Sequence, residues 1–259
     1  MPISYSIKSN TSLIIISLLI LVTTNCSSNY KGRNDLFDDD LKGNVSKATM
    51  LFYDIVEDSG KFYRGKLEYK YIFKFNHDGN ITDQTAITTT GKGSPVIDET
   101  IFNYNDKGQK TSDRHPSKSK PFSTTVFDDQ GKWKEIDSFD DKKGILLSKA
   151  EFSYPDSNSS EMNEYNSKGQ LLSKTTYKSH RHLVNELKKY DAKGMLVEES
   201  DFTYDSNGML QTTKNLLGHQ AHEISYKYSN KDNEGNYLIS TRFYDGKPYL
   251  FGEIMLEYY

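Results

Sequence analysis

The sequence predicts an all-β protein: an antiparallel meander of repeated β-hairpins that forms an extended or curled open sheet, with almost no helix after residue 25. Three observations predict this fold. A short turn motif recurs along the chain, and the residues between the turns alternate in character with a period of two. In addition, 19 Tyr and 13 Phe give a composition that favours pleated surfaces. No segment after residue 45 shows the apolar stripe of period 3.6 that an amphipathic helix requires.

The turn motif is an aromatic residue followed by Asn or Asp, two polar residues and Gly, as in Tyr165-Asn-Ser-Lys-Gly169. An Asn or Asp side chain at this position bonds back to the backbone, and the glycine adopts the left-handed conformation of a bulge. Eight copies, two of them loosened by insertions, predict turn glycines at Gly79, Gly108, Gly131, Gly144, Gly169, Gly194, Gly208 and Gly235.

Between the turns, side chains alternate as they do in a strand with one face in water. Tyr69, Tyr71 and Phe73 fall on one face, whereas Lys70 and Lys74 fall on the other. We therefore expect an aromatic face and a polar face. A membrane-spanning barrel would need an uncharged lipid-facing band about 25 Å tall, which such lysines argue against.

The N-terminal segment has the layout of a secretory signal peptide. Lys8 precedes an apolar run from Leu13 to Val22, which is too short to span a bilayer comfortably because a helix needs about 20 apolar residues. The stretch Val22-Thr23-Thr24-Asn25-Cys26 resembles a lipobox, the site at which a bacterial lipoprotein is cut so that its new N-terminal cysteine carries lipid. Thr23 and Asn25 depart from the usual lipobox residues and leave the efficiency of processing open.

The resemblance implies lipidation at Cys26, the single cysteine of the chain. The alternative is an ordinary signal peptide with an incidental cysteine nearby. We expect a lipoprotein signal peptide over 1–25, a lipidated polar and acidic tether over 26–48, and a repetitive β-sheet domain over 49–259. The acidic run at 35–40 is interpreted as part of the solvated tether.

The repeated unit, as in Tyr190-Asp-Ala-Lys-Gly-Met-Leu196, resembles the tyrosine-aspartate repeats of the RHS group of cell-surface proteins. The resemblance covers roughly residues 50 to 250 as scattered motifs. It implies a β-sheet shell or surface fibre. In that group such a shell sometimes encloses a C-terminal toxin domain, and the last residues here have the pattern of a strand instead.

The sequence gives little support for catalysis. Neither a Gly-x-Ser-x-Gly elbow nor a glycine-rich phosphate loop occurs in it. The adjacent carboxylates Glu198 and Glu199 would point to opposite faces of a strand, so they cannot form an acid/base pair by themselves. A net charge of −3 argues against a nucleic-acid partner. We therefore predict no catalytic residues and no cofactor.

Four histidines are the remaining candidates for a metal site: His180, His182, His219 and His222. His180 and His182 would share one strand face, but counting the turns places residues 180 and 219 at opposite edges of the sheet. No metal site is therefore predicted.

These observations predict a lipoprotein anchored through Cys26 to a bacterial membrane, most consistent with the outer membrane or cell surface. Its β-repeat domain would be non-catalytic and would serve binding or adhesion, with an unidentified protein or glycan as partner. The alternative is a structural envelope protein that assembles through sheet edges, and an enzyme is the least favoured class. Because loops tolerate divergence, the binding surface is expected in the irregular turns near His115 to Pro121, Ser179 to His182 and Gly218 to His222.

Overall fold

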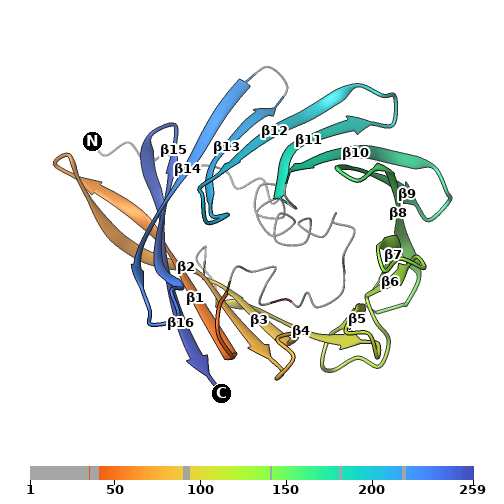
Figure 1. The fold of residues 1–259 in the computed structure, drawn as a ribbon, viewed down its shortest axis with the longest axis horizontal. Coiled ribbons are helices and arrows are strands. Elements are labelled where there is room, and N and C mark those ends of the chain that lie inside the picture. The colour runs from red at the N-terminus through yellow and green to blue at the C-terminus, as the bar shows by residue number, and fades with distance from the viewer. Residues whose placement is uncertain (1–34, 36–40, 90–93, 141, 181–182, 218–219) are drawn as a thin grey trace.

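The computed structural model describes residue 35 and the ranges 41–89, 94–140, 142–180, 183–217 and 220–259. Within them sixteen β-strands form a ring (Figure 1). None of the described residues belongs to a helix long and apolar enough to cross a bilayer. The signal peptide, Cys26, His182 and His219 lie outside the described residues. The strands are β1 (Val45–Asp58), β2 (Lys61–Phe75), β3 (Ile81–Thr88), β4 (Val96–Tyr104), β5 (Lys110–Arg114), β6 (Ser123–Phe127), β7 (Trp133–Phe139), β8 (Leu146–Asp156), β9 (Ser159–Asn166), β10 (Leu171–His180), β11 (Leu183–Asp191), β12 (Leu196–Tyr204), β13 (Leu210–Leu217), β14 (Gln220–Lys231), β15 (Tyr237–Tyr244) and β16 (Lys247–Tyr258).

The sheet is a closed barrel, so the predicted open sheet is wrong. Each strand pairs antiparallel with its sequence neighbours, and β1 also pairs with β16 from Val45↔Tyr258 to Asp54↔Leu250. The all-β character and the hairpin order agree with the sequence. Closure was missed because turn motifs and alternation describe neighbouring strands, whereas the β1–β16 pairing joins the two ends of the barrel chain. Strand β1 begins at Val45, so the last residues of the expected 26–48 tether lie in the barrel wall.

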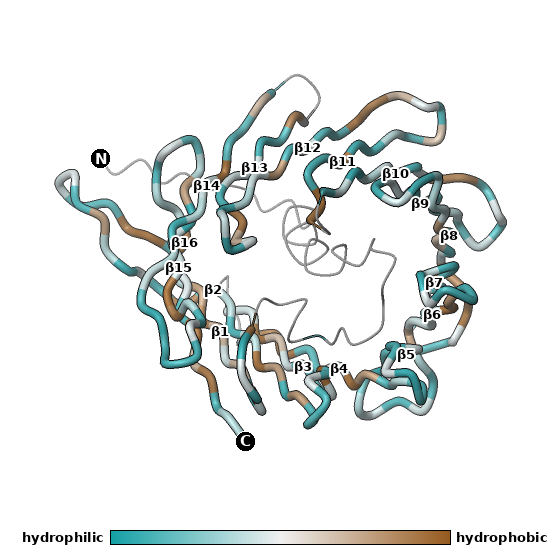
Figure 2. The backbone as a smooth tube through the Cα atoms, in the orientation of Figure 1, coloured by the Kyte–Doolittle hydropathy of each residue, from teal (hydrophilic) through white to brown (hydrophobic). Residues whose placement is uncertain are grey.

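The pairing register divides the side chains into two faces. Ala48, Tyr177, Ser200 and Phe202 lie on one face and are almost completely buried. A wall one strand thick shelters side chains only on its concave side, so this face is the interior of the barrel. Figure 2 shows apolar and polar residues interspersed around the whole ring, as alternation between two faces requires.

The outer face carries rows of lysine–glutamate ion pairs in mid-strand. The nitrogen-to-oxygen distances are 2.8 Å for Lys149–Glu135, 2.9 Å for Lys174–Glu161 and 3.0 Å for Lys188–Glu199. All are partly exposed, so each pair stabilises the fold only slightly. Together they place charge across the outer surface of β7 to β12, in agreement with a face that stands in water.

The recurring turn has one hydrogen-bond pattern, seen clearly at Asn166. Its Oδ1 accepts the N–H groups of Lys168 (2.9 Å) and Gln170 (3.0 Å), and its carbonyl accepts the N–H of Gly169 (2.9 Å). Asn76, Asn105, Asp128, Asp191, Asp205 and Asp232 accept the equivalent pairs of N–H groups. All eight motif glycines have positive φ, between 65° and 87°.

Tyrosines at strand ends tie neighbouring strands together. The hydroxyl of Tyr104 donates to the carbonyl of Ile81 at 2.7 Å, and that of Tyr204 donates to the carbonyl of Val184 at 2.7 Å. Both tyrosines are motif aromatics, so the motif supplies a turn and a strand-to-strand tie in one unit.

The motif turns occupy both rims of the barrel. The terminal rim, where β1 begins and β16 ends, has the turns at Gly79, Gly108, Gly131, Gly208 and Gly235. The distal rim has those at Gly144, Gly169 and Gly194. Such a hairpin has a fixed hand, and the chain runs one way around the ring. An aromatic that faces inward at one rim must therefore face outward at the other.

The register confirms this reversal. At the terminal rim Phe75 packs on the interior cluster of Ala48 and Phe73. At the distal rim Tyr165 pairs across the strands with Lys149, whose ammonium lies on the outer face. The same sequence motif thus supplies the barrel interior at one rim and the outer surface at the other.

Gly169→Val is expected to lower the free energy of unfolding by more than about 1 kcal/mol, because a β-branched residue resists positive φ. Gly169 has φ +74°, and no atom lies within 4 Å of the place that a β-carbon would take, so the cost comes from the backbone conformation alone. Urea denaturation would measure it. Gly169→Asn is the control, because Asn tolerates this conformation and should lose much less stability. Equal losses for Val and Asn would contradict the assignment.

Strands β5 and β6 share the fewest pairs in the barrel, Ser112↔Thr124 and Asp113↔Ser123. Burial raises the pKa of the Asp113 carboxyl, and nearby Lys110 offsets this only in part. The folded state therefore holds this proton more tightly than the unfolded chain. As a result, stability falls as pH rises through the raised pKa.

Asp113→Asn should therefore raise the melting temperature at pH 7. The gain should shrink as pH falls below the ordinary aspartate pKa of about 3.9, where the carboxyl is protonated in both the folded and the unfolded state. Thermal melts across this range measure the difference. A gain in melting temperature that does not change with pH would show that the charged carboxylate of Asp113 does not destabilise the pairing of β5 with β6.

Candidate ligand-binding pocket

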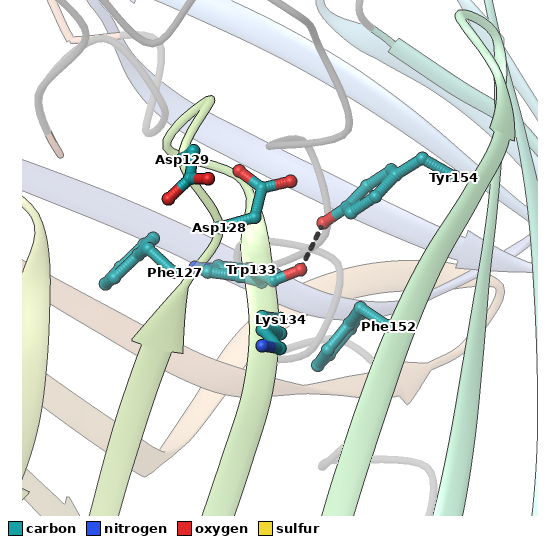
Figure 3. A pocket seen from close by; sticks show the side chains of 7 residues that line it. All are labelled: Phe127, Asp128, Asp129, Trp133, Lys134, Phe152 and Tyr154. Atoms are coloured by element: carbon teal, nitrogen blue, oxygen red, sulfur yellow. Dashed lines mark hydrogen bonds between the residues drawn. The ribbon is translucent and has the colours of Figure 1, made fainter.

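A cavity of about 320 Å³ opens beside the turn between β6 and β7, at the terminal rim (Figure 3). The hairpin supplies one wall and β8 supplies the other. Its lining residues are Phe127, Asp128, Asp129, Trp133, Lys134, Phe152 and Tyr154.

Aromatic side chains form the body of the pocket. The Trp133 and Phe152 rings lie 5.6 Å apart at 60°. The Tyr154 hydroxyl donates to the Trp133 carbonyl at 3.0 Å, the contact drawn in Figure 3. Phe152 pairs with Met162 and Met162 with Thr175, which is buried. This register places the aromatic wall on the sheltered face of the sheet.

Charged groups border the aromatic wall. Asp128 Oδ1 accepts the N–H groups of Gln130 (2.9 Å) and Lys132 (2.8 Å), which fixes the carboxylate in place. Asp129 and Lys134 are exposed. The Lys132 ammonium lies 4.7 Å from the centre of the Tyr154 ring. The pocket therefore offers flat apolar surfaces beside two carboxylates and an ammonium.

The sequence-based expectation about binding turns did not point to this pocket. The 115–121 turn lies at the distal rim, where the ring of His115 packs against Phe122 at 5.0 Å. A signal was nevertheless present. In the motif copy that ends at Gly131, the only tryptophan of the chain stands two residues after the glycine, where five of the other seven copies have Leu or Ile.

Of the four candidate histidines, the two whose positions are described, His180 and His222, lie at opposite rims. His180 ends β10 at the terminal rim, whereas His222 lies at the start of β14, near the distal rim. The His222 ring lies 2.5 Å from the Tyr244 hydroxyl and 3.4 Å from the Asp245 carboxylate. Among the residues with described positions, no group of three His, Cys, Asp or Glu residues forms a metal site.

A second aromatic cluster surrounds Arg242 on the sheltered face of β1, β14 and β15. Its guanidinium carbon lies 5.1 Å from the centre of the Phe52 ring and 5.7 Å from that of Tyr226. Burial raises the pKa of Tyr71 and of Tyr249, and Arg242 opposes both shifts. Because Arg242 already covers the ring faces of Phe52 and Tyr226, we assign a packing role to this cluster.

No protein-family model matches the chain, and no curated protein matches it. Among solved structures, a porin-like protein from Bacteroides uniformis aligns with a TM-score of 0.56 at 14% identity, over 83% of this chain and 99% of that chain. This similarity indicates a shared fold. A porin-like protein from Bacteroides vulgatus gives a TM-score of 0.43 at 13% identity, over 83% of this chain and 98% of that one. The TcdB2-TccC3 structure gives 0.18 at 13% identity, over 67% of this chain and 15% of that one. The last two scores are too low to support an inference, so the resemblance to RHS proteins depends on the turn motifs alone.

Proposed function

We propose that this chain is a non-catalytic binding protein of the bacterial cell envelope, held at a membrane by lipid on Cys26. The Trp133 pocket is its ligand site, and the ligand is a polar ring compound, a sugar unit of a glycan. The observation that carries the proposal is the combination of aromatic walls and carboxylates in one sheltered cavity.

The chemistry of the pocket suits a sugar. A pyranose ring has an apolar C–H face that packs on aromatic rings such as Trp133 and Phe152, and hydroxyls that donate to carboxylates such as Asp129. The 320 Å³ volume lies at the small end of the range for ligand sites, about 300 to 1,000 Å³. One or two sugar rings fit such a volume.

The carboxylates of the pocket support ligand binding. Asp128 Oδ1 already accepts two backbone N–H groups, so this carboxylate holds the turn that forms the pocket. Asp129 is exposed and lines the pocket, where its oxygens can accept hydroxyl groups of a ligand.

The outer face supports attachment by lipid rather than by insertion of the barrel. The ion pairs of Lys149, Lys174 and Lys188 lie in mid-strand, where a spanning barrel would need an uncharged band about 25 Å tall. The alternative of assembly through sheet edges is disfavoured, because pairing of β1 with β16 leaves neither strand as a free edge.

Fluorescence of Trp133 tests the proposal directly, because this is the only tryptophan in the sequence. The full chain in mild detergent would be titrated with neutral, acidic and amino-sugar oligosaccharides. We expect a saturable change in emission with at least one of these classes. Asp129→Asn should weaken that binding by about tenfold, the effect of losing roughly 1.4 kcal/mol.

Asp106→Asn is the matched control, because Asp106 has the same place in the turn that ends at Gly108. This variant should bind like the native chain. A flat titration with all sugars, or equal weakening by the two variants, would refute the proposed site.

A further inference from the structure

Exposed apolar side chains gather at the distal rim. Among the residues whose placement is described, four exposed large apolar ones lie toward the terminal rim: Val126, Met255, Tyr258 and Tyr259. Twelve lie toward the distal rim: Val56, Phe62, Tyr63, Val96, Ile97, Ile145, Leu147, Leu171, Leu172, Met195, Leu196 and Val197. The two ends of the barrel therefore differ sharply in surface character.

Seven of the twelve belong to three adjacent hairpins, β7–β8, β9–β10 and β11–β12, which we call the distal arc. In each hairpin the motif aromatic pairs across the strands with a leucine on the outer face: Phe139↔Leu146, Tyr165↔Leu171 and Tyr190↔Leu196. The next residue sits at a bulge and is strongly exposed, at 53% for Leu147, 45% for Leu172 and 41% for Val197. The same pair of apolar residues, a leucine on the outer face and an exposed residue at the bulge, thus occurs in three adjacent hairpins.

Lysines stand at the tips of the same hairpins. Lys143, Lys168 and Lys193 each directly precede the turn glycine and are exposed. The adjoining β5–β6 loop adds Lys120, whose Cδ lies 3.1 Å from the place a β-carbon on Gly144 would take. The turn aspartates Asp140 and Asp191 accept backbone N–H groups of their own turns, whereas the lysines beside them are exposed.

The turns of the terminal rim carry fewer lysines. The segments 76–80, 128–132, 155–159, 205–209 and 231–236 are each net acidic and 105–109 is neutral, while the sequence between β10 and β11 contains Arg181. The chain as a whole has a net charge of −3. All three motif copies of the distal arc have a lysine directly before the glycine, whereas among the five copies of the terminal rim only the one with Lys107 does.

We propose that the distal arc binds the surface of an anionic lipid bilayer. The exposed leucines of the three hairpins and the tyrosines paired with them enter the interfacial layer of the bilayer, and the long lysine side chains reach lipid phosphates. A bilayer is favoured over an acidic protein because six strands repeat the same groups over a width of roughly 24 Å. A repeated, convex surface suits a layer of identical headgroups, whereas a protein partner calls for one central recess. This contact is separate from lipid on Cys26, and it orients the Trp133 pocket away from the membrane.

Quenching by brominated lipids tests which rim meets the bilayer. The full chain with Trp133→Phe and Leu172→Trp carries one tryptophan in the distal arc, and the native chain carries one at the terminal rim. With vesicles of brominated phosphatidylglycerol, we expect strong quenching of the tryptophan at 172 and little quenching of Trp133. Val197→Trp in the Trp133→Phe chain is a second probe, should the first variant melt abnormally.

Charge variants complete the test. A triple variant should bind vesicles roughly a hundredfold more weakly, because each lysine near an anionic surface raises the affinity about fivefold. Its substitutions are Lys143→Glu, Lys168→Glu and Lys193→Glu. Lys107→Glu, at the equivalent motif position of the terminal rim, should not change vesicle binding.

Equal quenching of both tryptophans, or none at residue 172, would overturn the inference, whether or not the N-terminal region holds the chain to vesicles. Retention on immobilised polyglutamate without lipid quenching would assign the arc to an acidic protein and would also overturn it. Neither result would affect sugar binding in the Trp133 pocket.

Discussion

Cys26→Ala is expected to lose its lipid and to leave the membrane fraction in a high-salt wash, which weakens the charge-dependent contact proposed for the distal arc. The apolar run from Leu13 to Val22 is about half the length that a spanning helix needs. Several acyl chains on one cysteine hold far more firmly, because each buried methylene contributes about 0.8 kcal/mol. Fractionation of cells followed by mass spectrometry of the mature N-terminus would measure both retention and lipidation.

Ser27→Ala is the control for this experiment and should stay in the membrane fraction. If Cys26→Ala stayed in the membrane fraction through the high-salt wash as well as the native chain does, the lipid anchor would be refuted. The distal-arc proposal is separable, because it predicts vesicle binding without lipid on the cysteine.

Phe202→Ala is expected to cause the largest loss of stability among interior substitutions, about 3 to 5 kcal/mol. Phe202 is 5% exposed and packs with Tyr177 and Val184 in one of the two buried clusters of the described barrel. In a wall one strand thick, few neighbours can move to fill the cavity. Chemical denaturation would measure the loss.

Asp201→Ala is the matched control, because the preceding side chain points outward and is exposed. Its effect should stay within about 0.5 kcal/mol. Similar losses at residues 201 and 202 would contradict the assignment of the two faces.

Local features of the fold were predictable because their causes are local. The Asn or Asp of each motif accepts hydrogen bonds from N–H groups two and four residues ahead. The glycine of the same turn adopts a positive φ, which other residues rarely do. The alternation of aromatic and lysine side chains along β2 likewise depends only on residues that are close together in the sequence. The pairing of β1 with β16 has no local cause, and the sequence therefore left the choice between an open and a closed sheet undetermined.

The roles of individual motif aromatics were only partly predictable. Phe75, Tyr165 and Tyr190 hold the same place in the repeated motif, which by itself gives no reason to expect different roles. Phe75 is buried inside, whereas Tyr165 and Tyr190 lie on the outer face at the distal rim. The difference follows from the hand of the hairpin and from the rim that each turn occupies, which a repeat count cannot provide.

The candidate pocket was missed for a related reason. Variation between repeats was sought in irregular turns such as 115–121, whereas Trp133 follows one of the most regular turns. Its partner Phe152 comes from the next strand of the meander, β8, and the register is interrupted beside Trp133 by a bulge at Lys134, between the pairs Val126↔Glu135 and Phe127↔Trp133. Composition marked Trp133 as unique, but only the pairing register shows what it faces.

The sheltered face, the Trp133 pocket and the two unlike rims all depend on closure between β1 and β16. A disulfide tests this most directly, because Leu51 and Glu253 are paired across that seam on the outer face. In a chain with Cys26→Ser, the variants Leu51→Cys and Glu253→Cys should form an intramolecular disulfide on mild oxidation. Leu51→Cys with Glu161→Cys, on β9, should form none within one chain. No disulfide at 51 and 253, or equal yields for the two pairs, would contradict the closed barrel and the sites derived from it.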